Sequence, residues 1–145
     1  MADWKLLYST ARHGISINTF FRRAEMSTSP SLLVVEDTKK HVFGCFASLP
    51  WRQGHNYYGT GESFVFSVRP SFKMYRWSRK NDLFQLSDTA CLAVGGGGHF
   101  ALWLDNDFLH GSSGTCSTYD SECLASTTEF QIVYMEVWAL ESDMC

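Results

Sequence analysis

The chain lacks any long apolar run, and this absence limits the classes of protein to which it can belong. No stretch among its 145 residues approaches the roughly 20 apolar residues that cross a bilayer. The opening residues, MADWKLLYST, lack a basic start followed by a long apolar core, which argues against a secretory signal. We therefore expect a cytoplasmic protein without membrane insertion.

Paired cysteines and metal-type spacings are also missing. The five cysteines are an odd number without a C-x-x-C pair, so free thiols are expected. The five histidines have no metal-like spacing among themselves or with cysteine, and no metal or cofactor is expected. Cys45 and Cys91 stand among apolar residues and are expected in the core. Cys116, Cys123 and Cys145 stand in polar or terminal contexts and are expected to be exposed.

Signature motifs of common enzyme classes are absent as well. Gly95 to Gly98 precede HFALWLD rather than a phosphate-binding Lys, and their spacing does not fit the dinucleotide pattern. No G-x-S-x-G nucleophile motif occurs. Asp105 and Asp107 flank Asn106 and could hold a cation, although a polar hairpin turn fits this pattern better. These observations favour a protein without enzymatic activity.

Positive charge is absent from the second part of the chain, because no Lys or Arg follows Lys80. Residues 1–80 hold twelve basic and five acidic residues, a net charge of +7, whereas residues 81–145 hold ten acidic residues. The densest basic stretch, RPSFKMYRWSRK, interleaves cations with aromatics, as some nucleic-acid surfaces do. A strand and turn that pair with the acidic part is the better interpretation, since the isoelectric point lies below 7. No nucleic-acid partner is expected.

What the chain does have is abundant aromatic residues and many short apolar segments. Strands are predicted at WKLLYST, SLLVVED, HVFGCFAS, ESFVFSV, FKMYRW, ACLAV, HFALWLD, DFLHG and FQIVYMEVWAL, the last in the middle of a sheet. Apolar residues at helical spacing after Ser16, an N-cap residue, predict one helix over SINTFFRRAEM. Without βαβ alternation, this pattern predicts a mainly β (α+β) fold: a two-sheet antiparallel β-sandwich with peripheral short helices, in one domain spanning 1–145.

Two local features call for a structural explanation. The glycine run predicts a bulge or sharp corner between paired strands, packed tightly against an aromatic side chain or a partner's backbone. In ESFVFSV, alternation places Phe64, Phe66 and Val68 on one face, which we expect to point inward. Glu62 either shares that face or lies at the open end of the strand, bonded to the GTG backbone. The open-end position is the preferred alternative.

Several separated motifs resemble the TLDc family: YYGTGESFVFS, LAVGGGGHFALWLD, DFLHGSSGTCSTY and EVWALE. Two earlier segments are also similar, so the resemblance runs from about Trp4 to Glu141. It implies a two-sheet antiparallel β-sandwich, protection against oxidative stress, and binding to the vacuolar proton-pumping ATPase. It supplies no catalytic constellation. The positions that match the family's motifs are Gly59, Gly61, Glu62, Gly95, Gly96, Gly97, Gly98, Phe100, Trp103 and Asp105.

Two functional hypotheses follow. In the first, a monomeric interaction module uses the glycine corners, the Glu62 loop and Asp105 to engage subunits of the pump. Such a protein would be cytoplasmic and recruited to acidic organelle or vesicle surfaces, with mitochondrial or nuclear pools as alternatives. In the second, a thiol antioxidant consumes peroxide directly through Cys116. The lack of nearby Lys or Arg weighs against the second hypothesis. Hydrolysis at an unrecognised site near Glu62 and His99 is a third, weaker alternative.

Overall fold

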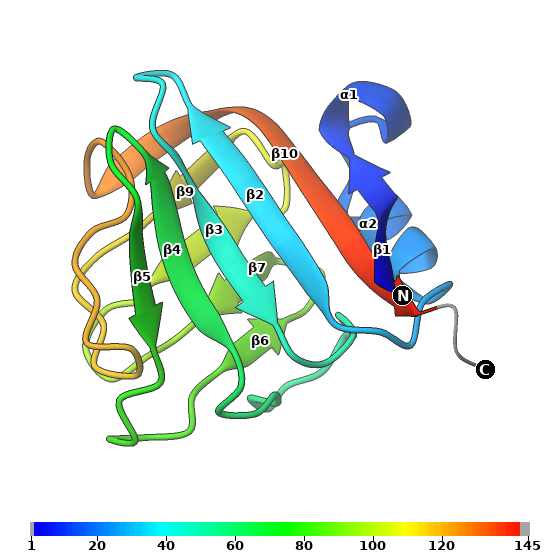
Figure 1. Ribbon diagram of the computed structural model, residues 1–145. Helices are drawn as coiled ribbons and strands as arrows, with labels where there is room; N and C mark the ends of the chain where they lie inside the picture. Colours follow the sequence, from blue (N-terminus) through cyan, green and yellow to red (C-terminus); the bar gives the residue numbers. More distant parts are fainter. Residues whose placement is uncertain (1, 143–145) are drawn as a thin grey trace.

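The computed structural model of the chain describes residues 2–142, and strands dominate it (Figure 1). The first strands are β1 (Ala2–Ser9), β2 (Ser31–Asp37), β3 (Val42–Ala47), β4 (Phe64–Arg69) and β5 (Lys73–Arg76). They are followed by β6 (Gln85–Ser87), β7 (Cys91–Val94), β8 (Leu102–Asp105), β9 (His110–Ser112) and β10 (Glu129–Ser142). Two short helices, α1 (Thr10–His13) and α2 (Ile17–Ala24), lie between β1 and β2.

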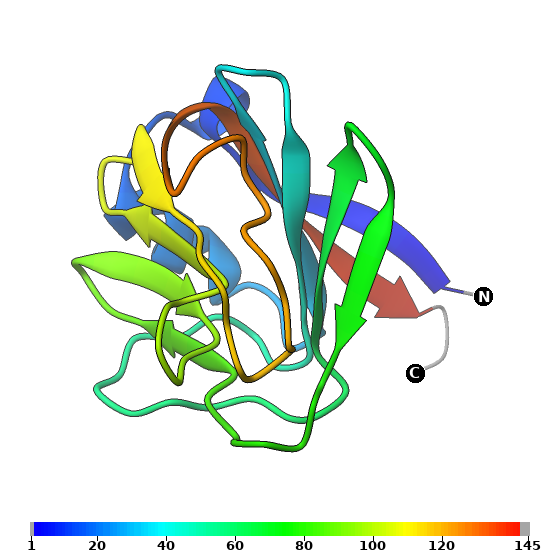
Figure 2. The ribbon, with the colours of Figure 1, turned by 90° about the vertical axis from the view of Figure 1, so that its left-hand side faces the viewer.

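The strands pair antiparallel in the order β5-β4-β3-β2-β10-β9-β8-β7-β6, and β1 also pairs with β10. The long strand β10 is shared, because residues 129–131 pair with β9 whereas later residues pair with β2 and β1. The first layer therefore contains β1 to β5 and most of β10, and the second contains β6 to β9 and the start of β10. Figure 2 shows the two layers side by side. The predicted two-sheet antiparallel sandwich is confirmed.

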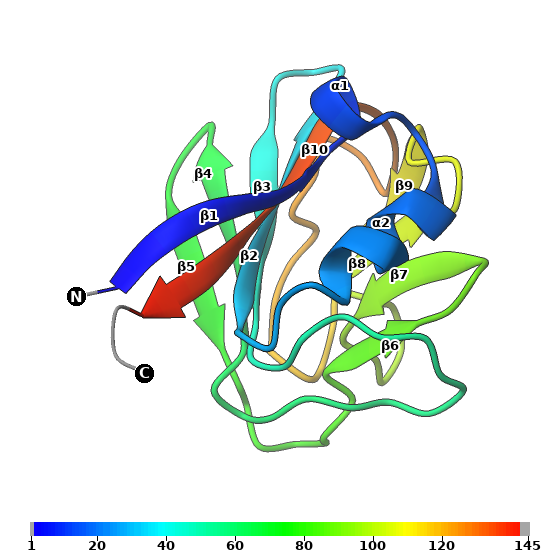
Figure 3. The same ribbon diagram turned by 90° about the vertical axis from the view of Figure 1, so that its right-hand side faces the viewer.

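Helix α2 forms where the sequence predicts it, and it closes one side of the sandwich. The Ser16 side chain accepts a hydrogen bond from the Thr19 backbone N–H and caps the helix. Phe20 points into the core, where its ring makes edge contacts with Tyr8 of β1 and with Phe108, which follows β8. Figure 3 shows α2 between the strands of the two layers. The sequence pattern does not predict α1, a single turn of four residues.

The inward and outward faces of β4 are the reverse of those expected. Val65 is fully buried and Ser63 and Ser67 face the same side, whereas Phe64 and Phe66 lie on the other face. The serines tolerate burial because they are hydrogen-bonded: Ser63 Oγ lies 2.8 Å from Tyr119 Oη, and Ser67 Oγ donates to the Ser71 carbonyl.

The outward-facing aromatics of β4 stabilise a different surface. Phe64 stacks on Phe46 of β3, with ring centroids 5.3 Å apart, on the outer face of the first layer. Val68 lies further along the same face and is 44% exposed. Phe66 is only 8% exposed, although it lies on this outer face and outside the main core cluster. The prediction that Phe64, Phe66 and Val68 face the core is therefore wrong, because alternation alone does not say which of two faces meets the core.

The basic and acidic parts of the sequence meet across the fold. Lys80 Nζ lies 2.6 Å from Asp120 Oδ1, and Lys73 Nζ lies 3.8 Å from Glu122 Oε2. Both pairs are exposed and contribute little to stability. They nevertheless agree with the interpretation of the basic stretch as a strand and turn beside the acidic part. Among the described residues, the helices are too short to cross a bilayer.

Candidate functional site

The glycine run makes the turn between β7 and β8. Gly95, Gly97 and Gly98 have φ angles of +83°, +76° and +124°. Residues that carry a Cβ rarely adopt such positive angles, whereas glycine adopts them readily. A Cβ on Gly95 would lie 2.5 Å from Cys116 Sγ, closer than real contacts allow. The run is therefore a sharp corner in close contact with its neighbours, as the sequence predicts.

The buried half of this corner is fixed by hydrogen bonds to its backbone. Tyr57 Oη donates to the Gly95 carbonyl at 3.0 Å, and the Gly96 N–H donates to Thr118 Oγ1 at 3.0 Å. Burial raises the pKa of the Tyr57 phenol, so it stays protonated and able to donate at neutral pH. The expected aromatic partner of the glycines is therefore Tyr57.

Three polar side chains extend this bonding towards the exposed half. Thr118 Oγ1 donates to Asn81 Oδ1 at 2.6 Å, and Asn81 Nδ2 donates to Ser117 Oγ at 3.0 Å. Ser117 Oγ in turn donates to the Gly97 carbonyl at 3.0 Å. With Tyr57, the corner is thus held by groups from three separate loops, and its exposed residues Gly97 and Gly98 sit on a rigid support.

The second glycine motif contacts the same part of the molecule. Gly61 packs flat against the ring of Trp77, and a Cβ on Gly59 would lie 2.9 Å from Phe84 Cβ. The Trp77 Nε1–H donates to the Asn81 carbonyl at 2.7 Å, which closes the segment Trp77–Asn81 into a turn. Gly61 therefore borders this segment on one side, while Gly97 borders Asn81 on the other.

Glu62 lies at the open end of β4, as the preferred alternative expects. Its side chain is exposed, so it does not share an inward face. The hydrogen bond at this position comes from the Glu62 backbone N–H to Thr60 Oγ1, rather than from the carboxylate. Glu62 lines a surface hollow of about 200 Å³ with Arg76, Trp77 and Arg79.

We call the combined region the glycine-corner surface and define it by Glu62, the segment Trp77–Asn81, Gly97, Gly98 and Asp120. Gly97 and Gly98 line a second hollow of about 400 Å³, which Asp120 also borders. The Lys80–Asp120 ion pair joins the segment Trp77–Asn81 to this hollow. The surface therefore presents exposed glycine backbone between charged groups of both signs.

Cys116 is buried rather than exposed, and the expectation from its polar context is wrong. Its backbone exchanges two hydrogen bonds with Ser121, and this pairing turns the side chain under the glycine corner. Its side chain lies against Gly95 and Gly96, and Sγ donates to the Gly96 carbonyl at 3.4 Å. Only 3% of the residue is exposed, so the thiol is packed as part of the corner's support.

The other cysteines follow the expectation where the structure describes them. Cys45 and Cys91 are buried and Cys123 is exposed, while Cys145 lies outside the described residues. Burial raises the pKa of the Cys45 thiol to about 12. Burial, together with the nearby carboxylates of Asp88 and Asp105, raises that of Cys91 to about 11. Neither thiol is suited to redox chemistry at neutral pH.

Asp105 does not belong to the glycine-corner surface. It pairs with Cys91 at the start of β7, whereas Val94, next to the glycines, pairs with Leu102. Three residue steps along the strand separate these two pairs, a span of about 10 Å. The Asp105 carboxylate instead accepts a hydrogen bond from Trp103 Nε1 at 2.8 Å. Their spacing in the sequence does not show that Asp105 and the glycine corner lie apart in the fold.

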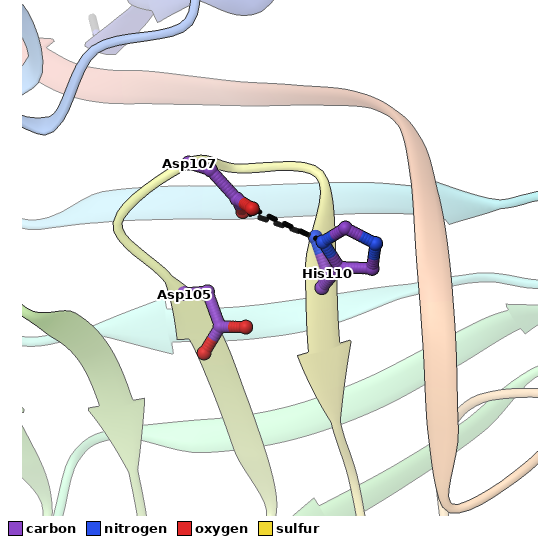
Figure 4. Close-up of side chains that lie close together, drawn as sticks. All are labelled: Asp105, Asp107 and His110. Atoms are coloured by element: carbon purple, nitrogen blue, oxygen red, sulfur yellow. Dashed lines mark hydrogen bonds and ion pairs between the residues drawn. The ribbon is translucent and has the colours of Figure 1, made fainter.

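Asp105 lies beside Asp107 and His110 at the β8–β9 turn (Figure 4). One potential ligand atom from each residue falls within 4.8 Å of the others, so within the described part of the chain these three side chains could share a cation. Asp107, however, accepts the backbone N–H of Leu109 at 2.8 Å and lies 3.0 Å from His110 Nδ1. It therefore acts as the stabilising acid of a polar hairpin turn.

The electrostatics of Asp107 agree with that structural role. Partial burial raises its pKa, but hydrogen bonds from the Leu109 backbone and from His110 outweigh burial and hold the pKa below its ordinary value. In the sequence, Asp105 and Asp107 alone indicate the turn. No sequence signal connects His110 with them, because only the return of the chain in β9 brings it back to them.

The fold and this site define a β-sandwich module that presents a rigid, glycine-cornered surface. The TLDc domain model matches residues 1–141, and the chain belongs to the TLDc domain family. It is similar to nuclear receptor coactivator 7 from Gallus gallus, with 43% identity over 139 residues, covering 95% of this chain and 15% of the relative. It is also similar to oxidation resistance protein 1 from Xenopus laevis, with 42% identity over 139 residues, covering 95% and 16%. The chain thus spans about a sixth of the length of these relatives.

Proposed function

We propose that this TLDc domain is a non-enzymatic interaction module that binds the vacuolar proton-pumping ATPase and regulates its assembly or activity. Through this pump it contributes to protection against oxidative stress. The resemblance of its motifs to the TLDc family supports the pump as the partner. The name of one relative, oxidation resistance protein 1, supports the link to oxidative stress. The domain acts in the cytoplasm at the surface of acidic organelles.

One observation carries the proposal: the glycine-corner surface is already ordered before any partner binds. Tyr57, Thr118 and Ser117 hold the glycine backbone through separate hydrogen bonds. A preformed surface loses little conformational entropy on association, and this raises affinity for a given contact area. Exposed glycine backbone also allows a partner's backbone to approach closely.

The hydrogen bonding of the polar side chains favours binding over catalysis. Asn81, Ser117 and Thr118 bond to one another and to the glycine backbone. Their donors and acceptors are therefore committed to structure rather than directed at a substrate. Cys116 is covered by the corner, and the side chain of Glu62 is exposed to solvent. The charged groups left on the surface, Glu62 and Arg79, are suited to orienting a partner.

A binding assay with the purified pump tests this assignment. Glu62→Ala removes an exposed carboxylate from the surface, and Glu25→Ala removes another exposed carboxylate, at the end of α2. We expect Glu62→Ala to weaken pump binding by about tenfold, a typical loss at an interface hot spot. Glu25→Ala should bind like the wild type, and both variants should keep the wild-type melting temperature. Equal binding by all three folded proteins would contradict this location of the site.

A further inference from the structure

A second exposed feature lies at the far end of the first layer. The β2–β3 turn carries Lys39 and Lys40, and the β4–β5 turn carries Arg69, Phe72 and Lys73. The two turns are neighbours because β3 and β4 pair there, with Val42 opposite Arg69. Figure 1 shows both turns at the upper left of the sheet. We call Lys39, Lys40, Arg69, Phe72 and Lys73 the basic tip.

Phe72 is unusual for its exposure. It is 66% exposed, and its two aliphatic neighbours on the adjoining strands, Val68 and Met74, are 44% and 40% exposed. A large apolar ring at the end of a turn contributes little to the core. Three such side chains on one hairpin form an exposed apolar patch. Such a patch contributes binding energy only when a membrane or another molecule covers it.

Cations surround this apolar patch. Lys39, Lys40, Arg69 and Lys73 are all exposed. The nearest acidic partner that pairs with them is Glu122, whose oxygen lies 3.8 Å from Lys73 Nζ with both side chains more than half exposed. Asp37 is buried, and its carboxylate accepts the backbone N–H groups of Lys39 and His41. It does not offer its charge at the surface. Glu36 is half-buried and lies in the same cross-strand row as Arg69, with Val42 between them. The four cations still outnumber Glu36 and Glu122, so the tip keeps a net positive charge.

We propose that the basic tip docks this domain on the surface of a bilayer that carries anionic lipids. The cations contact the lipid phosphates and carboxylates, and the Phe72 ring enters the boundary between headgroups and acyl chains. An aromatic ring is well suited to that boundary. The contact is peripheral and needs no segment that spans the membrane. It is therefore compatible with the expectation that the chain does not cross a bilayer.

The composition of the tip favours lipid over an acidic protein or a nucleic acid. An exposed ring on the same hairpin as the exposed Val68 and Met74 fits a deformable apolar interface. A nucleic-acid surface would instead offer several aromatic faces along a groove for stacking bases. The tip also lies at the opposite end of β4 from Glu62, so docking leaves the glycine-corner surface free. The inference therefore stands independently of the proposed partner.

Vesicle sedimentation tests the proposal directly. The full chain is mixed with vesicles of phosphatidylcholine and phosphatidylserine in equal parts, or of phosphatidylcholine alone. Binding is expected only to the anionic vesicles and is expected to fall as salt is added. Phe72→Ser and the double variant Lys39→Gln/Lys73→Gln should each lower the partition coefficient by about tenfold.

Matched controls test whether binding depends on the basic tip rather than on any exposed cation or apolar side chain. Met26→Ser removes an apolar side chain that is 65% exposed beyond α2, and Arg12→Gln/Arg22→Gln removes two exposed cations from the helices. Both should bind vesicles like the wild type. Loss of binding in these controls, or wild-type binding by the folded Phe72→Ser variant, would overturn the proposal. Binding to polyglutamate or duplex DNA, but not to anionic vesicles, would overturn it in favour of an acidic macromolecule.

Discussion

Asp37 and Ser126, 89 residues apart in the chain, are joined by two hydrogen bonds. The Ser126 N–H and hydroxyl both donate to Asp37 Oδ2, at 3.0 and 2.7 Å. The other carboxylate oxygen accepts the N–H groups of Lys39 and His41. Asp37 is fully buried, so this one carboxylate ties the β2–β3 turn to the loop that precedes β10. It thereby fixes that loop beside the basic tip.

The first prediction concerns stability at neutral pH. Asp37→Asn keeps the shape of the side chain but replaces the charged carboxylate with a neutral amide. The amide NH2 group then faces N–H or O–H donors that the carboxylate had accepted. We expect a loss of about 1–3 kcal/mol in the free energy of unfolding. Urea denaturation at pH 7 measures it. Asp82→Asn, at an exposed position, is the matched control and should change stability by less than about 0.5 kcal/mol.

The second prediction concerns the pH dependence of this effect. Burial raises the pKa of Asp37, but the hydrogen bonds from Ser126, His41 and Lys39 outweigh it and lower the pKa below its ordinary value. A depressed folded-state pKa gives stability that is present above the unfolded pKa, about 4, and is lost as pH falls through the folded value. Wild type and Asp37→Asn should therefore converge in stability below about pH 4. An unchanged difference at pH 3 and pH 7 would contradict this role.

The third prediction concerns the glycine corner. Gly95→Ala adds a Cβ only 2.5 Å from Cys116 Sγ at a φ of +83°, and it should cost about 2 kcal/mol or more. Cys116→Ala removes the clashing sulfur, so a double-mutant cycle in thermal or urea unfolding should show favourable coupling of at least about 0.5 kcal/mol. Gly54→Ala, where a Cβ meets open space, serves as the control. Simple additivity of Gly95→Ala and Cys116→Ala would argue against the contact.

The fourth prediction concerns thiol reactivity. In a Cys145→Ser background, a thiol-specific disulfide reagent should modify Cys123 rapidly in the native protein, because that residue is exposed. Cys45, Cys91 and Cys116 are buried and should react only when the protein unfolds. Mass spectrometry of the labelled peptides identifies each site. Rapid native labelling of Cys116 would restore the direct peroxide hypothesis that its burial opposes.

Much of the fold could be predicted because local signals agree with the tertiary structure. The Ser16 cap and the spacing of Phe20 and Phe21 specify α2, and the polar turn before His41 specifies the β2–β3 hairpin. The face of β4 could not be predicted, since the burial of Ser63 depends on a distant partner as well as a local one. Its hydroxyl donates to the Thr60 carbonyl and also bonds to Tyr119 Oη, 56 residues away. Periodicity carries no information about such distant partners.

The glycine motifs of the candidate site could be predicted from the sequence, but their meeting in one surface could not. Both glycine motifs were identified from residue type, because glycine runs require an explanation wherever they occur. Their meeting across the segment Trp77–Asn81 depends on that segment's long-range contacts, such as Asn81 with Ser117 and Thr118. Cys116 lies in a polar local sequence that predicts exposure, but it is covered by Gly95 and Gly96, about 20 residues away in the chain.

The most direct test of the account is a titration of purified vacuolar proton-pumping ATPase with the purified domain. Bound domain and ATP-driven proton transport are measured in the same samples. The account predicts saturable binding that changes transport and that Glu62→Ala weakens while Glu25→Ala does not. Absence of saturable binding by the folded wild-type domain would contradict the central claim, whatever the outcome at the basic tip.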